Sequence, residues 1–223
     1  MADTHESTDV LVIGGGAVGS SIAYFLRTRA NPARVTVIER DPTYALASTP
    51  RASGGVRRLF SGPENIALSN FSIPFYARFR EDMAVGGEPA DINWRNGGYL
   101  FIVPELGQRT LEKNAEVQQR HGVRVELLER AALQQRFPSM FVGDLAMGAL
   151  SLDDGWVDPN SVLWGFRRKA ASLGAQFVAD AVTAIDVDGE RARRVHLQSG
   201  DVWTAEWVRH SGARVVGGWR HPQ

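Results

Sequence analysis

The chain has 223 residues, which suffices for one large domain or for one domain and part of another. Hydrophobic residues make up 43% of the sequence and charged residues 22%, which is typical of folded soluble proteins and excludes disordered or fibrous classes. The 25 basic and 25 acidic side chains balance, so no net positive charge favours nucleic acid as a partner. The absence of cysteine excludes disulfides, thiolate metal sites and cysteine nucleophiles.

The sequence carries no signal for export or for a membrane. Its first nine residues are acidic and polar, whereas a secretory signal begins with basic residues and continues with an apolar run. No segment approaches the roughly 20 apolar residues that cross a bilayer. We therefore expect a cytoplasmic protein without a membrane span.

A strand, a glycine-rich turn, a helix and a second strand are predicted in the first 39 residues. Residues 9–13 form a short apolar run, the pattern of a strand buried on both faces of a parallel sheet. Apolar residues recur at helical spacing from residue 17 to about residue 29, and residues 35–39 predict the next strand. This order and length indicate a βαβ crossover unit.

The middle of the chain predicts an insertion. Residues 40–62 form a connection rich in Ser, Gly and Arg, and an amphipathic helix follows from Pro63. Beyond Gly86 the pattern changes to a strand, a polar helix and another strand, at residues 98–103, 105–120 and 123–128. This change indicates an inserted second domain.

The last third of the chain predicts one helix and then short strands. Asp158 and Pro159 have the pattern of a helix N-cap followed by a first helical residue, and this helix runs through Ser172. Turns at residues 188–189 and 199–200 separate apolar runs. We expect a β-meander with tight hairpins from residues 176–178, 182–187, 195–198 and 202–208.

The motif with chemical meaning is Gly14-Gly15-Gly16-Ala17-Val18-Gly19, which satisfies G-x-G-x-x-G between a predicted strand and a predicted helix. Gly14 permits a tight turn, Gly16 lets the backbone approach a pyrophosphate, and Gly19 lets the helix pack closely. The helix N-terminus presents N–H groups and a positive dipole end to the phosphates. Glu39, 20 residues after Gly19, would accept hydrogen bonds from a ribose.

This fingerprint fits NAD and FAD alike, whereas a carboxylate at Glu39 disfavours the 2′-phosphate of NADP. A glycine turn that binds no ligand is the structural alternative. The five histidines are scattered without metal-ligand spacing, so we expect no metal site. No nucleophile and base arrangement is visible either.

Later segments are more specific than the glycine motif. In chain order, the segments Ile38–Asp41, Ala47–Thr49, Ala52–Arg58, Gly98–Phe101 and Asp153–Pro159 resemble the FAD-dependent D-amino-acid oxidase superfamily, and within it the sarcosine and dimethylglycine oxidase or dehydrogenase branch. The stretches Glu39–Tyr44, Ala47–Thr49, Gly54-Gly55 and Phe60–Ile66 are most similar to mitochondrial FAD-dependent oxidoreductase-domain proteins that assist complex I assembly. The resemblance covers roughly residues 8–208.

In this superfamily FAD lies extended across the sheet, and the resemblance implies which residues would hold it here. The glycine motif would hold the pyrophosphate, Glu39 the ribose, and Arg40 would lie near the adenosine end. Val182 lies where these proteins hold the adenine with main-chain groups. The diphosphate and the flavin would be lined by Ser48 and by the turn Ser53, Gly54 and Gly55, for which a solvated loop is the alternative.

Two arginines are candidates for a substrate contact. Relatives that oxidise amines bind the substrate carboxylate with arginine, so the resemblance points to Arg58 and, after it, to Arg57. Surface arginine without a ligand is the alternative. The complex I assembly relatives lack these arginines, which argues against an amino-acid substrate.

We expect an α/β protein with a FAD-type Rossmann domain, which has a βαβ unit, a mostly parallel sheet and a β-meander. This domain would comprise residues 1–85 plus 145–208, and residues 86–144 would form part of an incomplete substrate domain. The expected function is FAD-dependent oxidation of a C–N bond in a small amine or amino acid, of the sarcosine, dimethylglycine or D-amino-acid type. The alternatives are a non-catalytic FAD-binding assembly factor or chaperone, and an NAD-dependent dehydrogenase.

Residues 209–223 depart from the pattern with which relatives close the FAD site. The resemblance implies that the chain is truncated at its C-terminus and lacks the rest of the substrate domain. We expect this chain to retain FAD weakly and to be a poor catalyst. We also expect it to self-associate through sheet edges that are left unpaired.

Overall fold

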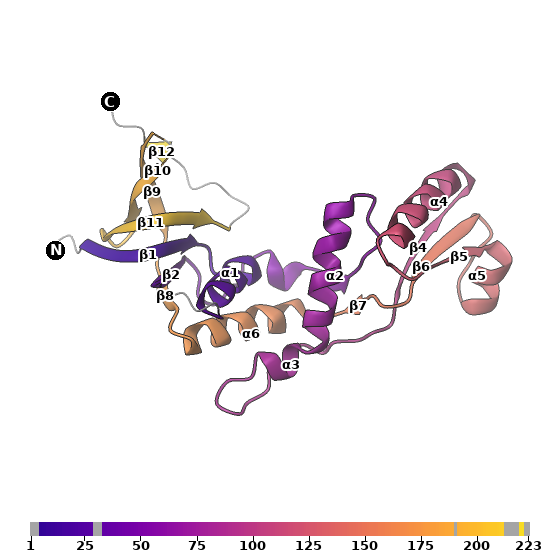
Figure 1. Cartoon of the computed structure of the whole chain (residues 1–223), viewed down its shortest axis with the longest axis horizontal. Helices are drawn as coiled ribbons and strands as arrows, with labels where there is room; N and C mark the ends of the chain where they lie inside the picture. Colours follow the sequence, from indigo (N-terminus) through magenta and orange to yellow (C-terminus); the bar gives the residue numbers. More distant parts are fainter. Residues whose placement is uncertain (1–4, 29–32, 190, 212–218, 221–223) are drawn as a thin grey trace. The chain divides into compact units, whose positions relative to one another are not determined.

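The computed structural model describes residues 5–28, 33–189, 191–211 and 219–220 (Figure 1). The chain forms two compact units. The first unit comprises residues 1–52, 83–90 and 159–223, and the second comprises residues 53–82 and 91–158. Each unit has its own hydrophobic core.

A seven-stranded sheet with the order β12-β9-β10-β11-β1-β2-β8 forms the first unit. Its strands are β1 (His5–Ile13), β2 (Val35–Glu39), β8 (Gln176–Ala179), β9 (Val182–Asp188), β10 (Arg191–Leu197), β11 (Val202–His210) and β12 (Trp219–Arg220). Strand β1 is parallel to both β11 and β2, and β2 is parallel to β8. The mostly parallel α/β sheet predicted from the sequence is confirmed.

The predicted meander is correct for three strands and wrong for the fourth. Strand β10 pairs antiparallel with β9 and with β11, and the turns at Gly189 and Gly200 have φ values of 59° and 101°. Strand β8, however, lies at the opposite edge of the sheet, parallel to β2. The physical reason is that a helix precedes β8, and such a crossover places the next strand parallel to its neighbour.

Helices α1 (Ala17–Thr28) and α6 (Pro159–Ser172) lie side by side in the first unit (Figure 1). The Phe166 ring lies 5.7 Å from the Tyr24 ring and 6.3 Å from the Phe25 ring, measured between centroids. Arg27 Nε, in the last turn of α1, donates to the Leu173 carbonyl at 2.8 Å. These contacts anchor the C-terminal half of α1 to α6 and to the residue that follows it.

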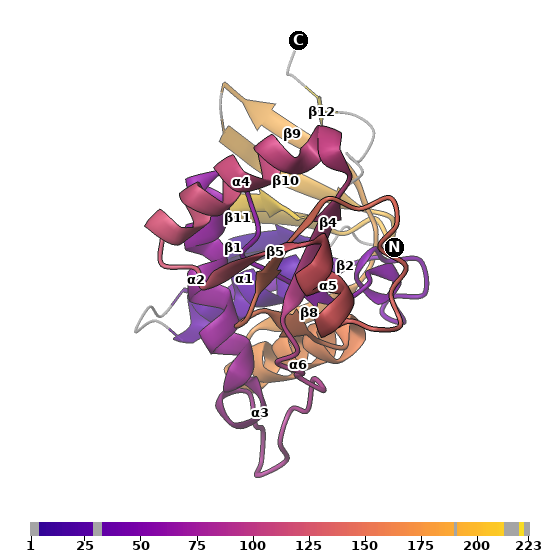
Figure 2. The same cartoon turned by 90° about the vertical axis from the view of Figure 1, so that its right-hand side faces the viewer.

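The second unit contains a three-stranded antiparallel sheet with the order β4-β6-β5, formed by Tyr99–Val103, Met147–Ser151 and Val125–Glu129. Its two faces are covered by different helices, α4 (Glu105–Arg120) and α5 (Arg130–Arg136) (Figure 2). Leu111 of α4 shares a cluster with Ala149, and Leu133 of α5 packs with Leu128. Helices α2 (Pro63–Ala77) and α3 (Phe79–Asp82) belong to the same unit. Among the described helices of both units, none is long and apolar enough to cross a membrane.

A two-stranded ribbon, β3 (Gly55–Val56) with β7 (Gly155–Trp156), is also part of the second unit. The sequence patterns did not predict this ribbon, nor α5 and β6. Strand β6 is buried along its whole length and includes Gly148 and Ala149, so it shows neither alternation nor bulky β-branched residues. Strands of two residues and a helix of seven are too short to produce a periodic signal.

The boundaries of the two units differ from the predicted domain division. The sequence grouped residues 53–82 and 145–158 with the first strand and helix, whereas the structure includes them in the second unit. Strand β6 explains part of the difference, since residues 147–151 pair with β4 and β5 of the predicted insertion. Leu59 and Ile66 share a hydrophobic cluster with Leu111 of the same insertion, which accounts for the earlier segment. The assignment of one part to the cofactor and the other to the substrate stays a prediction.

Candidate functional site

The glycine turn Gly14–Gly19 joins the C-terminal end of β1 to the start of α1. Gly14 has a φ of 93°, which side chains rarely allow, and its N–H donates to the Ile38 carbonyl at 2.8 Å. A Cβ atom at Gly19 would collide with the Gly14 carbonyl oxygen. Glycine at these two positions is therefore required by the tight turn and by the close approach of the helix.

Gly16 is a glycine for which the packing of the protein gives no reason. A Cβ atom there would have only one described neighbour within 4 Å, the Thr49 hydroxyl oxygen of the 3₁₀-helix η1 (Thr49–Arg51), at 3.6 Å. The same hydroxyl accepts the N–H of Ala17 at 3.3 Å. N–H groups in the first turn of a helix have no intrahelical acceptor. The turn thus offers open backbone and the positive end of a helix dipole, which suits a phosphate group.

Glu39 ends β2 beside this turn, and its side chain is half-buried. One carboxylate oxygen, Oε2, accepts the Gly15 N–H at 2.7 Å, and the other, Oε1, accepts the Asp41 N–H at 2.9 Å. A carboxylate oxygen can accept more than one hydrogen bond, so Glu39 keeps the capacity to bind a diol. Arg40, the next residue, is exposed.

The other predicted cofactor residues of the first unit lie along the same edge. Val182 begins β9 and packs in a core cluster with Ile38, the residue before Glu39. The N–H of Asp180 donates to the Glu39 carbonyl at 3.0 Å, so the connection from β8 to β9 passes the end of β2. Ser48 is exposed immediately before η1, and Val18 is exposed in the first turn of α1.

Sequence reasoning missed Tyr44, Thr49 and Ser211 at this edge. Tyr44 is 1% exposed, and a Cβ atom at Gly15 would lie 3.0 Å from its hydroxyl oxygen. The Ser211 hydroxyl lies 2.7 Å from the Gly14 carbonyl oxygen and donates to it. Ser211 follows β11, and only the parallel pairing of β11 with β1 brings it to the turn. No local pattern in the sequence could have indicated these three contacts.

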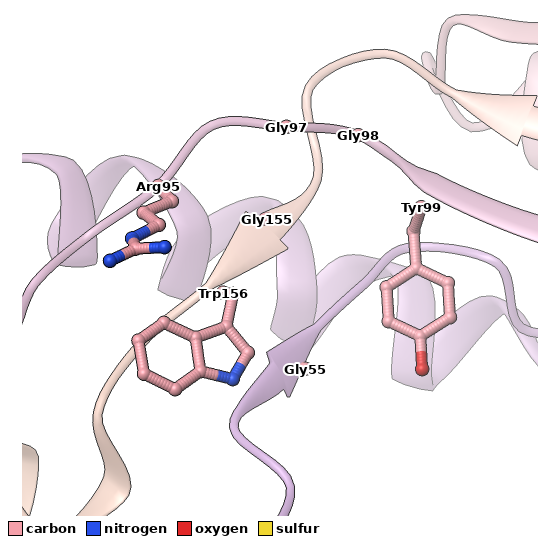
Figure 3. Close-up of a pocket in the computed structure, with 7 residues that line it drawn as sticks. All are labelled: Gly55, Arg95, Gly97, Gly98, Tyr99, Gly155 and Trp156. Carbon is pink, nitrogen blue, oxygen red and sulfur yellow. The ribbon is translucent and has the colours of Figure 1, made fainter.

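A pocket of about 510 Å³ opens in the second unit (Figure 3). Its walls are formed by Gly55, Gly97, Gly98 and Gly155 together with the side chains of Arg95, Tyr99 and Trp156. Trp156 Nε1 donates to the Ser53 carbonyl at 2.6 Å, and Gly54, between Ser53 and Gly55, is buried with a φ of 80°. The Arg95 guanidinium lies 5.6 Å from the Trp156 ring centroid. Glycine backbone and aromatic rings of this kind suit a flat ring system.

Arg58 is already engaged within the protein. Its Nη1 atom lies 3.4 Å from Asp154 Oδ1, its backbone N–H donates to Asp154 Oδ2 at 2.7 Å, and its Nε donates to Asn70 at 2.8 Å. The Asp154 side chain is fully buried, and that of Arg58 is 12% exposed. The positive charge of Arg58 is therefore balanced by a buried carboxylate.

Arg57 has a different environment. Its guanidinium carbon lies 4.7 Å from the Phe60 ring centroid, 5.3 Å from that of Phe101 and 5.6 Å from that of Tyr99, a residue of the pocket wall. Its Nε atom is buried and has no hydrogen-bond partner among the described residues. Rings stabilise a guanidinium through cation–π attraction without using its N–H groups, so Arg57, unlike Arg58, has no carboxylate partner among the described residues.

The chain matches the family described as FAD dependent oxidoreductase over residues 9–216. It is a member of this family. The match extends into residues 209–223, the segment that the sequence patterns set aside as divergent. Within the described part of the chain no group of three or more His, Asp or Glu side chains could hold a metal ion.

Named relatives of the chain are longer than it is. FAD-dependent oxidoreductase domain-containing protein 1 of Xenopus laevis is 41% identical over 174 residues, which are 76% of this chain and 35% of that protein. Sarcosine oxidase subunit beta of Rhizobium meliloti (strain 1021) is 26% identical over 92% of this chain and 49% of that protein. The chain therefore spans between about a third and a half of these relatives.

The fold is shared with solved oxidoreductases. L-proline dehydrogenase from P. horikoshii has a TM-score of 0.81 and 24% identity, over 93% of this chain and 53% of that one. Glycine oxidase from Bacillus cereus ATCC 14579 has a TM-score of 0.73 and 23% identity, over 92% of this chain and 55% of that one. At these identities the likeness concerns the fold.

FAD is the cofactor of this family, and the residues of the first unit fit it. Among the described residues only the Thr49 hydroxyl borders the space that a Cβ atom at Gly16 would fill, so this space suits a pyrophosphate, and Glu39 carries spare acceptor capacity for a ribose. The pocket beside Gly55 has the flat glycine and aromatic walls that a ring system requires. Each unit by itself thus presents groups that match part of a dinucleotide.

Proposed function

We propose that this chain is the flavin-binding part of an FAD-dependent oxidoreductase that oxidises a C–N bond in a small amine or amino acid. Membership of the FAD dependent oxidoreductase family supports the cofactor. The sarcosine oxidase and glycine oxidase relatives support an amine substrate. The observation that carries the proposal is the glycine turn with its open Gly16 beside the carboxylate of Glu39.

We assign the adenosine half of FAD to the first unit. The backbone of the turn Gly14–Gly19 would bind the pyrophosphate through N–H groups other than those of Gly14, Gly15 and Ala17, which donate within the protein. Glu39 would accept the ribose hydroxyls. Arg40 is exposed next to Glu39, which supports a contact with the adenosine, and the main chain at Val182 would bind the adenine. Ser48, exposed before η1, would contact the diphosphate.

We assign the flavin side to Ser53, Gly54 and Gly55 of the second unit. The hydrogen bond from Trp156 to Ser53 supports this assignment, because it orders the turn beside the glycine-walled pocket. Bound FAD supplies a hydride acceptor, and the protein contributes orientation and electrostatics. Oxidation of the amine would give an imine, which water hydrolyses.

Of the two candidate arginines, Arg57 fits a substrate carboxylate better than Arg58. Arg58 already faces the buried carboxylate of Asp154, whereas Arg57 Nε has no partner among the described residues. Guanidinium groups bind carboxylates through paired, charge-assisted hydrogen bonds. We therefore infer that the substrate carries a carboxylate that pairs with Arg57.

We also propose that the chain associates with a further chain or with itself. One named relative is a subunit, sarcosine oxidase subunit beta, which supports association of this chain with a further chain or with itself. Light scattering of the purified chain at several concentrations tests this association. The cytoplasmic location expected from the sequence stays a prediction.

The cofactor is tested by titrating the purified chain with FAD, FMN and NADH and measuring each affinity by calorimetry. We expect FAD to bind most tightly. Anaerobic addition of sarcosine, dimethylglycine or D-amino acids to the FAD-loaded chain should then bleach the flavin absorbance slowly, in keeping with the poor catalysis expected from the sequence. Binding of FAD without bleaching by any amine would support the non-catalytic alternative. Preference for NADH would refute the proposal.

A further inference from the structure

Tyr44 is a bulky residue in a conformation that costs energy. Its φ is 58°, in the left-handed region that disfavours residues with a large side chain. It is nonetheless among the largest fully buried side chains of the described structure. Strain of this kind persists only where the surroundings fix it, and it concentrates at functional sites.

The surroundings of Tyr44 fix both its backbone and its ring. Its N–H donates to the Asp41 carbonyl at 2.9 Å, and its own carbonyl accepts the Ala47 N–H at 3.0 Å. The Tyr44 ring meets the Trp164 ring edge-on, with centroids 5.3 Å apart. The connection after Glu39 therefore folds back and carries the phenol underneath the glycine turn.

The hydroxyl of Tyr44 lies against Gly15. A Cβ atom at Gly15 would be 3.0 Å from this hydroxyl oxygen and 3.1 Å from the Cβ atom of Glu39, closer than most real Cβ contacts. The N–H of Gly15 is the group that donates to Glu39 Oε2 at 2.7 Å. Tyr44, Gly15 and Glu39 thus form one packed set, and the position of Gly15 depends on both side chains.

The hydroxyl of Tyr44 interacts electrostatically with the charges of Arg167 and Glu39. The Tyr44 oxygen is buried and has no hydrogen-bond partner among the described residues, and the same holds for Arg167 Nε. The Arg167 guanidinium is enclosed by the Trp164 and Phe177 rings, at 5.3 and 4.9 Å from their centroids. Burial raises the pKa of the Tyr44 phenol, and the nearby Arg167 charge offsets part of that rise. The phenol therefore stays neutral, and its oxygen serves as a spacer.

We propose that Tyr44 is a positioning residue for the adenosine site. Its hydroxyl fixes the position of the Gly15 backbone and, through the Gly15 N–H, the orientation of the Glu39 carboxylate. This inference rests on the proposed function, because it assigns the ribose to Glu39. The hydroxyl itself is inaccessible, so it acts on a nucleotide only through Gly15 and Glu39.

Tyr44→Phe separates positioning from ordinary packing. The variant keeps the ring against Trp164 and removes a buried hydroxyl that has no hydrogen-bond partner within ordinary geometry among the described residues, although Arg167 interacts with it electrostatically. The melting temperature should therefore change little. The affinity for ADP, measured by calorimetry on the full chain, should fall about fivefold, because the site is less well pre-organised. Tyr76→Phe, the same change in the second unit, is the matched control and should leave ADP affinity unchanged.

A double variant tests the contact directly. Gly15→Ala should reduce ADP affinity about tenfold, because the new methyl group meets the Tyr44 hydroxyl. The double variant Gly15→Ala with Tyr44→Phe should bind ADP at least threefold more tightly than Gly15→Ala alone, because the hydroxyl that the methyl group meets is absent. The proposal would be overturned if Tyr44→Phe left the ADP affinity unchanged. It would also be overturned if the fold-loss of ADP affinity in the double variant equalled the product of the fold-losses in the two single variants. If the parent chain binds neither ADP nor FAD, the proposed function itself fails.

Discussion

The guanidinium of Arg58 pairs with the carboxylate of Asp154, a side chain without exposed surface. The same carboxylate accepts the backbone N–H of Arg58, so Arg58 is held both by its side chain and by its main chain. Burial raises the pKa of Asp154, and the N–H and guanidinium of Arg58 offset part of this rise. The pair fixes the connection between β3 and α2 to the residue that precedes β7.

Asp154 should leave a signature in the pH dependence of stability. Because its pKa is raised in the folded state, the folded chain holds this proton more tightly than the unfolded chain does. Above the ordinary value of 3.8, and up to the raised value, the free energy of unfolding therefore falls as the pH rises. Asp154→Asn removes this titration. Urea unfolding should show a larger stability advantage of the parent over the variant near pH 4 than near pH 7. A constant advantage would contradict the assignment.

Arg58 and Arg57 should differ in what their loss does to the fold. Arg58→Met leaves a buried carboxylate without its partner and should lower the free energy of unfolding by about 3 kcal/mol at pH 7. Arg57→Met removes only contacts with aromatic rings and should cost about 1 kcal/mol. Chemical denaturation of both variants at pH 7 measures the difference. Equal losses would mean that the Asp154 pair is no stronger than the ring contacts.

Arg57→Met should affect substrates that carry a carboxylate and no others. Loss of a charge-assisted pair should raise the sarcosine concentration for half-maximal flavin bleaching about tenfold or more. Methylamine, which lacks the carboxylate, is the matched control substrate and should be oxidised equally by parent and variant. An equal change for both amines would show that Arg57 acts on the flavin or on the fold rather than on the carboxylate.

The glycine turn offers two substitutions with opposite consequences. Gly16→Val meets only the Thr49 hydroxyl among the described residues, at ordinary contact distance, and should change the stability of the cofactor-free chain by less than about 0.5 kcal/mol, yet abolish FAD retention. Gly19→Ala collides with the Gly14 carbonyl and should destabilise the same chain by about 2 kcal/mol. Thermal unfolding and flavin absorbance measure the two effects. If a folded Gly16→Val chain retained FAD, the assignment of the pyrophosphate to this turn would be wrong.

Glu39→Ala should weaken the adenosine half of the cofactor selectively. The variant loses hydrogen bonds to a charged group, and the affinity for FAD should fall by about 1.5 to 3 kcal/mol. FMN has no adenosine, so its affinity should not change. Calorimetric titration of parent and variant with both flavins measures this. A parent chain that binds FMN as tightly as FAD would exclude the proposed role of Glu39.

By itself, the sequence determined the βαβ unit, its glycine turn and the acidic residue at the end of β2. These features follow from local rules: apolar runs, helical spacing and the glycines that a tight turn and a close helix require. The two hairpins of the meander were also predictable from local sequence, because Asp188-Gly189 and Ser199-Gly200 specify their turns. FAD as the cofactor came from motif spacing together with family resemblance.

Only the tertiary structure decided which distant residues complete these local features. Strand β8 pairs with β2 and is not part of the predicted meander, because α6 connects the two sides of the sheet before it. Asp154 neutralises Arg58, and Tyr44 lies under Gly15, through contacts that no spacing in the sequence specifies. Ser211 reaches the Gly14 carbonyl only because β11 runs parallel to β1. The physical reason is common to all four: a local pattern encodes backbone conformation, whereas burial and pairing between remote segments depend on the packing of the whole unit.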